Sequence, residues 1–498
     1  MRAVTILTLA LVVLSATAVP LPAATATPEP AGPERYIIAF HEAPGPLAPG
    51  GALYGAPIVT VNEYLPLVVV ETTNPAALQA AALADSNVRL VERDGVVRHL
   101  GANATYTPND SRYNRLYALP QIKVPQAWDT TKGDPGVSVC VLDTGVRYTH
   151  EDLTGARYRG GYDYVNRDAD PWDDEGHGTH VTGIAVATMD NGKGIAGVAQ
   201  ASFYHVKVLA ATGSGYFSDV ANGITWCANN AGSRVVISMS LGALGASGAV
   251  DYAASYAFNE KGALLVAAAG NDGVNCGECV NHPADSANVI AVTCTKNGGG
   301  MCSYSSVGST AEVAAPGDNI LSTLFDCDTC YGGMSGTSMS TPHVAGVAAL
   351  VWSAHPEASN ERVRRVLQAS ARDLGTVGWD PRYGHGEVDA AAALTVGAMT
   401  PGVPRNLRTE GGVDRIRVQW DAPRDDGNSP IQKYRVFITD DKGTTVVREV
   451  PGTTREHTET GYLPGTMRYF RVSAVNALGE GAKSGLVTGS TLSLDIVT

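Results

Sequence analysis

Four polar side chains occupy positions from which acyl-transfer chemistry could be assembled. Asp143 and Asn271 each follow a buried apolar run, whereas His177 stands between two glycines. Ser338 precedes a run of small and apolar residues that predicts a buried helix. Pro342 is expected in the first turn of that helix, where its missing N–H costs nothing, so the helix should begin near Ser338. A helix start offers unpaired N–H groups to a developing oxyanion.

Each of these residues has an ordinary structural explanation when it is taken alone. Asp and Asn are common in turns, and Ser338 could simply cap a helix. Together they supply a nucleophile, a base, a carboxylate that orients the base and an amide for an oxyanion. His180 could also be the base, but the flanking glycines favour His177 and leave His180 as a packing residue. The order Asp…His…Ser differs from the Ser…Asp…His order of α/β-hydrolases and disfavours an esterase.

The segments that must position these residues alternate between strands and helices from about residue 106 to residue 396. Buried apolar runs predict strands over 137–142, 203–209, 235–240, 263–269 and 289–292. Helical stretches lie between them, so we expect an α/β domain with a mostly parallel, doubly wound sheet. Ligands and chemistry gather at the carboxyl ends of the strands in such sheets, where the candidate side chains stand.

The N-terminal residues predict an exported chain. A basic start, a short apolar run over 6–14 and small residues at Ala16 and Ala18 or at Ala24 and Ala26 predict a signal peptide over 1–26. Residues 27–105 then predict a small α+β unit, with strands over 34–40, 65–70 and 88–94 and a helix over 76–83. This unit could be an ordinary domain or a prodomain that is removed.

The composition and the cysteines agree with export. The chain has 498 residues, room for about three domains, and its formal net charge of −13 argues against nucleic-acid binding. All eight cysteines lie between Cys140 and Cys330, and export makes four disulfides the default expectation. Two Cys-x-x-Cys motifs also have the spacing of a zinc knuckle, but both read as turns. Cys294 and Cys302 flank a hairpin-like turn and could pair, while the remaining connectivity stays open.

The C-terminal part changes character. A Pro/Gly-rich linker is predicted over 397–404, and residues 405–498 alternate in the manner of an all-β sandwich. With its buried Trp and regular turns, this segment resembles a fibronectin type III domain.

Residues 106–396 resemble the subtilisin-like serine proteases, the subtilase family, on its thermitase and proteinase K side. The resemblance rests on segments that surround the candidate residues: 141–145, 177–180, 240–242, 268–271, 315–317 and 336–343. It implies that Ser338 is the nucleophile, that His177 is its general base, and that Asp143 orients the imidazole. It further implies an oxyanion hole made by Asn271 and the Ser338 N–H, and it identifies residues 27–105 as an inhibitory propeptide.

The family also implies where substrate and calcium bind. A substrate strand should lie against two segments, Gly213, Ser214, Gly215 and Ser240, Leu241, Gly242, with Phe217 lining an apolar pocket. The spacing of an acidic loop predicts one Ca²⁺ site, for which a merely solvated loop is the alternative: Asp163, Asn166, Asp168, Asp170. The resemblance implies a second, tighter structural Ca²⁺ site, to which Lys193 and Ile195 could contribute only carbonyls: Asp110, Asp152, Thr188, Asn191, Lys193, Ile195.

The sequence therefore predicts a secreted, calcium-stabilised serine endopeptidase that is made as a self-processing zymogen. Its expected partners are protein or peptide substrates and its own propeptide as inhibitor, and we expect a monomer. The C-terminal sandwich is expected to bind a surface, a polymer or a protein. A catalytically silent binding or adhesion protein is the alternative, but the intact set of site residues speaks against it.

Overall fold

The computed structural model describes residues 34–62, 65–94 and 106–493 of the chain. The chain divides into two compact units, Met1–Asn103 and Ala104–Thr498, which are described separately. The predicted signal peptide over 1–26 and the last residues of the predicted propeptide, 95–105, lie outside the described residues. Within the described ranges, no helix combines the length and the apolar character needed to span a membrane.

The N-terminal unit is a small α+β fold, as predicted. Its sheet has the strand order β2-β3-β4-β1-β5, with strands β1 (Glu34–Phe40), β2 (Ala52–Leu53), β3 (Ala56–Val61), β4 (Leu67–Thr72) and β5 (Val88–Arg93). Helix α1 (Pro75–Leu83) is capped by Asn74, whose side chain accepts the N–H of Ala77, and Leu78 packs the helix against the sheet. The sequence did not predict β2 and β3, because glycines flank them and Pro57 lies within β3, and these residues resemble turn signals.

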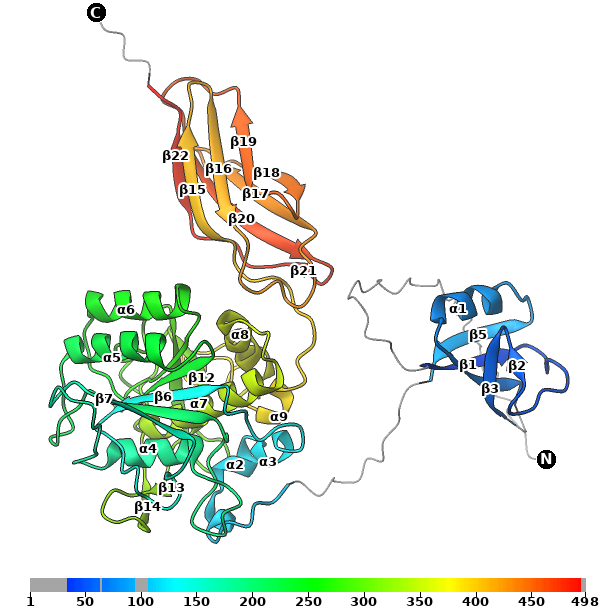
Figure 1. Ribbon diagram of the computed structural model, residues 1–498. Coiled ribbons are helices and arrows are strands. Elements are labelled where there is room, and N and C mark those ends of the chain that lie inside the picture. Colours follow the sequence, from blue (N-terminus) through cyan, green and yellow to red (C-terminus); the bar gives the residue numbers. More distant parts are fainter. Residues whose placement is uncertain (1–33, 63–64, 95–105, 494–498) are drawn as a thin grey trace, which may run out of the picture. The chain divides into compact units, whose positions relative to one another are not determined.

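The second unit begins with an α/β domain built on seven parallel strands. Their order is β12-β11-β10-β9-β6-β8-β7, with bounds β6 (Ser138–Asp143), β7 (Tyr158–Asp163), β8 (Ser202–Lys207), β9 (Val235–Met239), β10 (Leu264–Ala268), β11 (Val289–Thr295) and β12 (Ala311–Pro316). Helices α4 (His177–Val186) and α7 (Thr337–Ala354) pack together, and α5 (Phe217–Asn230) and α6 (Gly248–Asn259) form a second pair on the opposite face (Figure 1). The predicted doubly wound sheet is confirmed.

Two strands of this sheet were not predicted. Strand β7 lies at one edge and contains Gly160 and Gly161, which weaken a strand pattern. Strand β12 lies at the other edge, where Glu312 pairs with Arg364 of helix α8 (Asn360–Ser370) and Pro316 ends the strand. Neither strand has the continuous apolar run that marks the central strands, so periodicity alone could not find them.

Helix α7 runs through the middle of the domain, and almost all of its residues are buried. It begins at Thr337, which agrees with the predicted start near Ser338. The prediction that Pro342 lies in the first turn is wrong, because Pro342 is the sixth residue of the helix. Its missing N–H leaves the carbonyl of Ser338 without an intrahelical partner, and the hydroxyl of Ser240 donates to that carbonyl instead, at 2.7 Å.

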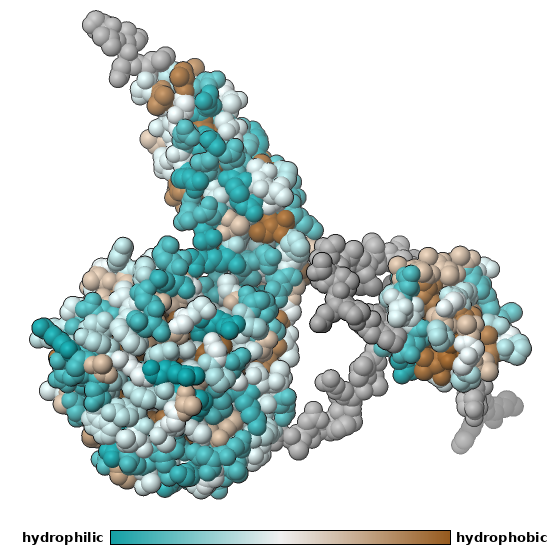
Figure 2. Space-filling view, in the orientation of Figure 1, coloured by the Kyte–Doolittle hydropathy of each residue, from teal (hydrophilic) through white to brown (hydrophobic). Residues whose placement is uncertain are grey.

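Short elements and a β sandwich make up the rest of the second unit. The short elements are η1 (Tyr113–Arg115), α2 (Ala118–Gln121), α3 (Val124–Ala127), β13 (Ile320–Thr323), β14 (Tyr331–Met334) and α9 (Ala390–Ala393). The sandwich consists of β15 (Arg405–Gly411), β16 (Arg415–Asp421), β17 (Lys433–Thr439), β18 (Thr445–Pro451), β19 (Glu456–Thr460), β20 (Met467–Asn476), β21 (Gly479–Glu480) and β22 (Val487–Ser490). Trp420 and Tyr434 pack in its core, which confirms the predicted buried Trp. Hydrophilic and intermediate residues dominate the visible face of both domains (Figure 2).

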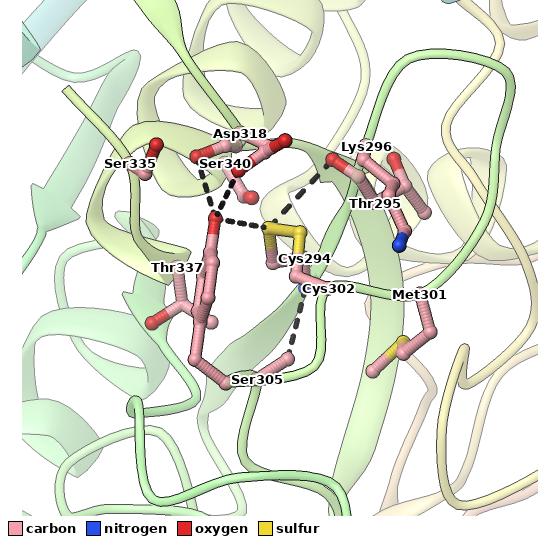
Figure 3. The surroundings of a disulfide bond; sticks show 12 residues. Cys294, Thr295, Lys296, Met301, Cys302, Ser305, Asp318, Ser335, Thr337 and Ser340 are labelled. Carbon is pink, nitrogen blue, oxygen red and sulfur yellow. Dashed lines mark hydrogen bonds between the residues drawn. A yellow bond between two sulfur atoms is a disulfide. The ribbon is translucent and has the colours of Figure 1, made fainter.

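All eight cysteines are paired, as the sequence predicted. The four disulfides are Cys140–Cys227, Cys276–Cys279, Cys294–Cys302 and Cys327–Cys330. Each Cys-x-x-Cys motif closes on itself, so neither is a zinc knuckle. The Cys294–Cys302 disulfide lies close to Thr337 and Ser340 in the first turn of α7 (Figure 3).

Candidate active site

Three neighbouring strands end at the same edge of the sheet and bring polar groups together there. Asp143 is the last residue of β6, Ser240 directly follows β9, and Asn271 lies three residues beyond β10. These strands are adjacent in the order β10-β9-β6, so their carboxyl ends meet. Helices α4 and α7 begin at the same edge and contribute His177 and Ser338.

Asp143 and His177 form a hydrogen-bonded pair. The carboxylate is fully buried, and its Oδ1 lies 2.8 Å from Nδ1 of the imidazole and accepts the N–H of Thr144. The side chain of His177 is 25% exposed, so its outer edge stays accessible. The flanking glycines explain the fit, because a Cβ at Gly178 would lie 2.1 Å from the carbonyl oxygen of Gly145.

The neighbouring charges affect the basicity of His177. Burial lowers the pKa of the imidazole, but the negative charge and hydrogen bond of Asp143 outweigh this effect and raise the pKa above its ordinary value. Asp143 thereby favours the charged form of the ring, which is what an orienting carboxylate must do for a general base.

His205 and Asp173, which the sequence did not single out, connect the segments that carry this pair. The N–H of Gly145 donates to Nε2 of the fully buried His205, at 3.1 Å, so Nδ1 carries the ring proton and faces the Thr182 hydroxyl at 3.3 Å. Buried Asp173 accepts the hydroxyls of Thr144 and Thr179 and the N–H of Gly176. The only sequence signal for Asp173 was an acid just before a helix start.

Ser338 is held in a reciprocal contact with Ser240. Its hydroxyl donates to the carbonyl of Ser240, at 3.1 Å, while the Ser240 hydroxyl donates to the carbonyl of Ser338. The imidazole of His177 lines the same cleft as Ser338. Ser338 and His177 thus face one cleft, and catalytic hydrogen bonds often tighten only when substrate binds.

Asn271 is oriented by the residue before the serine. Its Oδ1 accepts the backbone N–H of Thr337 at 3.0 Å and the Thr337 hydroxyl at 3.2 Å. This contact fixes the amide so that its Nδ2 is the group left to donate. Because Asn271 and Ser338 both line the cleft, the amide nitrogen and the backbone N–H of Ser338 can serve one oxyanion.

A cleft of about 500 Å³ joins these groups to the predicted substrate segments. All six predicted substrate-binding residues line it: Gly213, Ser214, Gly215, Ser240, Leu241, Gly242. Phe217 lines it as well, and its ring meets that of His282 edge to face at 5.6 Å. Asn281 forms part of the wall and donates to Asp272 at 2.8 Å. The structure thus brings together every predicted catalytic and substrate-binding residue.

The two predicted calcium sites differ in how well they fit a cation. At the second, tighter site, the loop from Thr188 to Ile195 wraps around buried Asp152, which accepts hydrogen bonds from Asn191 and from the N–H of Ile195. Lys193 lies 3.6 Å from Glu151. Asp110 approaches this loop, and its buried Oδ1 has no hydrogen-bond partner. A buried carboxylate oxygen without a partner fits a hard cation.

The carboxylates of the acidic loop differ from Asp110 in their hydrogen bonding. Both oxygens of Asp163 accept hydrogen bonds from within the loop, from the N–H groups of Val165 and Asn166 and from the Asn166 amide. Asp168 accepts the N–H of Asp170, and Asp170 accepts the Tyr148 hydroxyl. Neither oxygen of Asp163 is without a partner, so the loop lacks the buried, unpartnered oxygen that Asp110 offers at the other site. Over the described residues, no cluster of three or more His, Cys, Asp or Glu side chains could hold a metal.

Comparisons with known proteins place this site in a family. Residues 134–386 match the subtilase family model, and residues 402–490 match the fibronectin type III domain. Thermitase of Thermoactinomyces vulgaris is 43% identical over 291 residues, which are 58% of this chain and 99% of thermitase. A halolysin-like extracellular serine protease, Nep of Natrialba magadii, is 42% identical over 351 residues, 68% of this chain. The chain spans 62% of that relative's length.

A comparison of the fold with solved structures points to the same class of protein. A solved protease from Pseudoalteromonas arctica has a TM-score of 0.53 and 34% identity, and the match covers 58% of this chain and 98% of that structure. The chain therefore belongs to the subtilase family, and it carries a C-terminal fibronectin type III domain.

Proposed function

We propose that this chain is a secreted serine endopeptidase that hydrolyses peptide bonds through an acyl-enzyme on Ser338. The observation that carries the proposal is the hydrogen-bonded Asp143–His177 pair at 2.8 Å, whose imidazole lines one cleft with Ser338 and Asn271. Family membership and the names of the relatives, which include extracellular serine proteases, support the same activity.

The proposed reaction uses each residue for one task. Ser338 turns from the Ser240 carbonyl toward Nε2 of His177, which takes its proton as the oxygen attacks the peptide carbonyl. Asp143 stabilises the resulting imidazolium, and Asn271 Nδ2 donates to the oxyanion with the N–H of Ser338. His177 then gives its proton to the leaving amine, and water releases the acyl group by the reverse steps.

The test compares the full chain with Ser338→Ala. We expect the wild-type chain to cleave an internally quenched peptide and to react with a fluorophosphonate probe, and we expect Ser338→Ala to do neither. Ser335→Ala is a matched control on the loop before α7, and it should react like the wild type. A wild-type chain that folds but neither cleaves nor reacts would instead favour the silent binding protein.

We further propose that the chain is made as a zymogen. Residues Met1–Asn103 form a compact unit of their own, as expected for a prodomain. N-terminal sequencing of the expressed product should find a start near residue 106 in the wild type and an uncut chain in Ser338→Ala. The same start in both variants would contradict self-processing.

Calcium is proposed at the Asp110–Asp152 site only, while the acidic loop stays a sequence prediction. The ion would supply positive charge to the two buried carboxylates and tie the segment before η1 to the loop from Thr188 to Ile195. We expect a chelator to lower the melting temperature of Ser338→Ala, which cannot digest itself, and excess Ca²⁺ to restore it. Asp110→Asn should remove most of this calcium response. An identical melting temperature with and without chelator would refute the proposal.

A further inference from the structure

One charged side chain in the cleft has no part in the proposed chemistry. Among the described residues that line the cleft, Glu175 alone carries a carboxylate. It stands two residues before His177, at the start of helix α4. None of the ion pairs found between described residues includes Glu175, whereas the neighbouring Asp174 pairs with the buried Lys207 at 2.6 Å. Glu175 thus brings an unpaired negative charge to the substrate cleft.

The position of this carboxylate is well defined. Its Oε2 accepts the N–H of His177 at 2.9 Å, and the backbone N–H of Glu175 donates to buried Asp173 at 3.1 Å. A Cβ built on Gly213 would lie 3.7 Å from Oε1. Oε1 therefore faces the segment Gly213–Gly215, along which a substrate strand is expected to bind, and it does so beside the catalytic imidazole.

We infer that Glu175 selects substrates with a cationic side chain, Lys or Arg, at the position that lies between His177 and Gly213. The inference rests on the proposed function, since it names a substrate class for the same cleft. A carboxylate on the wall of a cleft interacts more strongly with a cation than one on an open surface, because protein replaces part of the solvent between them. A neutral side chain would gain nothing there, and an acidic one would be repelled.

A simpler explanation is that Glu175 only stabilises the start of α4. Its Oε2 accepts a first-turn N–H, and a negative charge is favourable at a helix N-terminus. Glu175→Gln separates the two roles, because the amide oxygen can still accept the N–H of His177 while the charge is lost. Asp174→Asn is the matched control, since it removes the same charge one residue away, where the carboxylate is 43% exposed and paired with Lys207.

The experiment measures binding, so that it does not depend on hydrolysis. Labelled hexapeptides of one neutral frame carry Lys, Gln or Glu at each position in turn. The full chain with Ser338→Ala is expressed with an added cleavage site after Asn103, so that the N-terminal unit can be cut off and removed, and the Kd of each peptide is then measured by fluorescence anisotropy. We expect Lys to tighten binding about fivefold over Gln at one position, the size of a good partly exposed ion pair. Adding Glu175→Gln should reduce that ratio to about one, while adding Asp174→Asn should leave it unchanged.

Two outcomes would overturn the inference: no position that prefers Lys, or a preference that survives in Glu175→Gln. A second measurement needs no variant at residue 175, because raising NaCl from about 0.05 M to about 1 M must weaken the Lys peptide more than the Gln peptide. Equal salt effects would also overturn it. Cleavage of the Gln peptides by the wild-type chain without any Lys preference would refute this inference alone, whereas a failure to cleave any peptide would refute the proposed function.

Discussion

Acidification should unfold the α/β domain because three of its histidines are buried in the neutral form. His180, His205 and His343 are each at most 2% exposed. Burial lowers the pKa of each imidazole to about 4 from an ordinary value of 6.5. For His180, the neighbouring histidines lower the pKa further. For His205, Lys207 also lowers the pKa, whereas Asp143 and Asp173 raise it and so oppose the effect of burial.

The direction of the effect follows from proton uptake on unfolding. Between pH 6.5 and pH 4 the unfolded chain binds protons at these histidines and the folded chain does not, so stability is fully present above pH 6.5 and falls as the pH drops. At about 1.4 kcal/mol per pKa unit, a shift of this size corresponds to about 3 kcal/mol for each histidine and about 10 kcal/mol for the three together. A typical domain has about 5–15 kcal/mol in total. His177 has the opposite sign, because its raised pKa adds stability at low pH.

The assay is urea unfolding of Ser338→Ala, followed by tryptophan fluorescence, at a series of pH values between 7 and 5. Near the middle of the titration the three histidines should give a slope of about 3–4 kcal/mol per pH unit in the free energy of unfolding. His205→Asn removes one titrating group and should lower that slope by about a third. His355→Asn is the control, since the side chain of His355 is 40% exposed. An unchanged slope in His205→Asn, or a stability that does not fall toward pH 5, would refute the reasoning.

Two further predictions concern the oxyanion donor and the disulfides. Replacing Asn271 by Ala should lower kcat about 10²–10³-fold, the range found for such a donor in subtilisin, with little change in KM; steady-state kinetics test it, and a larger effect on KM than on kcat would contradict it. The Cys140–Cys227 disulfide joins residues 87 apart, and Cys276–Cys279 joins residues 3 apart. Replacing both cysteines by Ala should therefore lower the free energy of unfolding by about 4.6 kcal/mol for the first pair and by about 1.9 kcal/mol for the second. Urea unfolding measures both values, and a reversed order would contradict the loop-closure argument.

The sequence by itself determined the chemistry available to this protein. The candidate residues follow predicted strands or precede a predicted helix, and the carboxyl ends of parallel strands must meet at one edge of the sheet. These residues are Asp143, His177, Asn271 and Ser338. Long apolar runs made the central strands readable, because a strand buried on both faces needs them. The edge strands β7 and β12 lacked that signal, since their polar or glycine residues face solvent or a neighbouring ion pair.

Only the tertiary structure decided how these groups contact one another. The exchange of hydrogen bonds between Ser240 and Ser338 joins residues 98 apart, and Cys140 pairs across 87. No local pattern encodes contacts at such separations, because they depend on which strand ends become neighbours in the sheet. For the same reason, the sequence could name Ser338 as a nucleophile but could not place Glu175 in the substrate cleft or His205 against the N–H of Gly145.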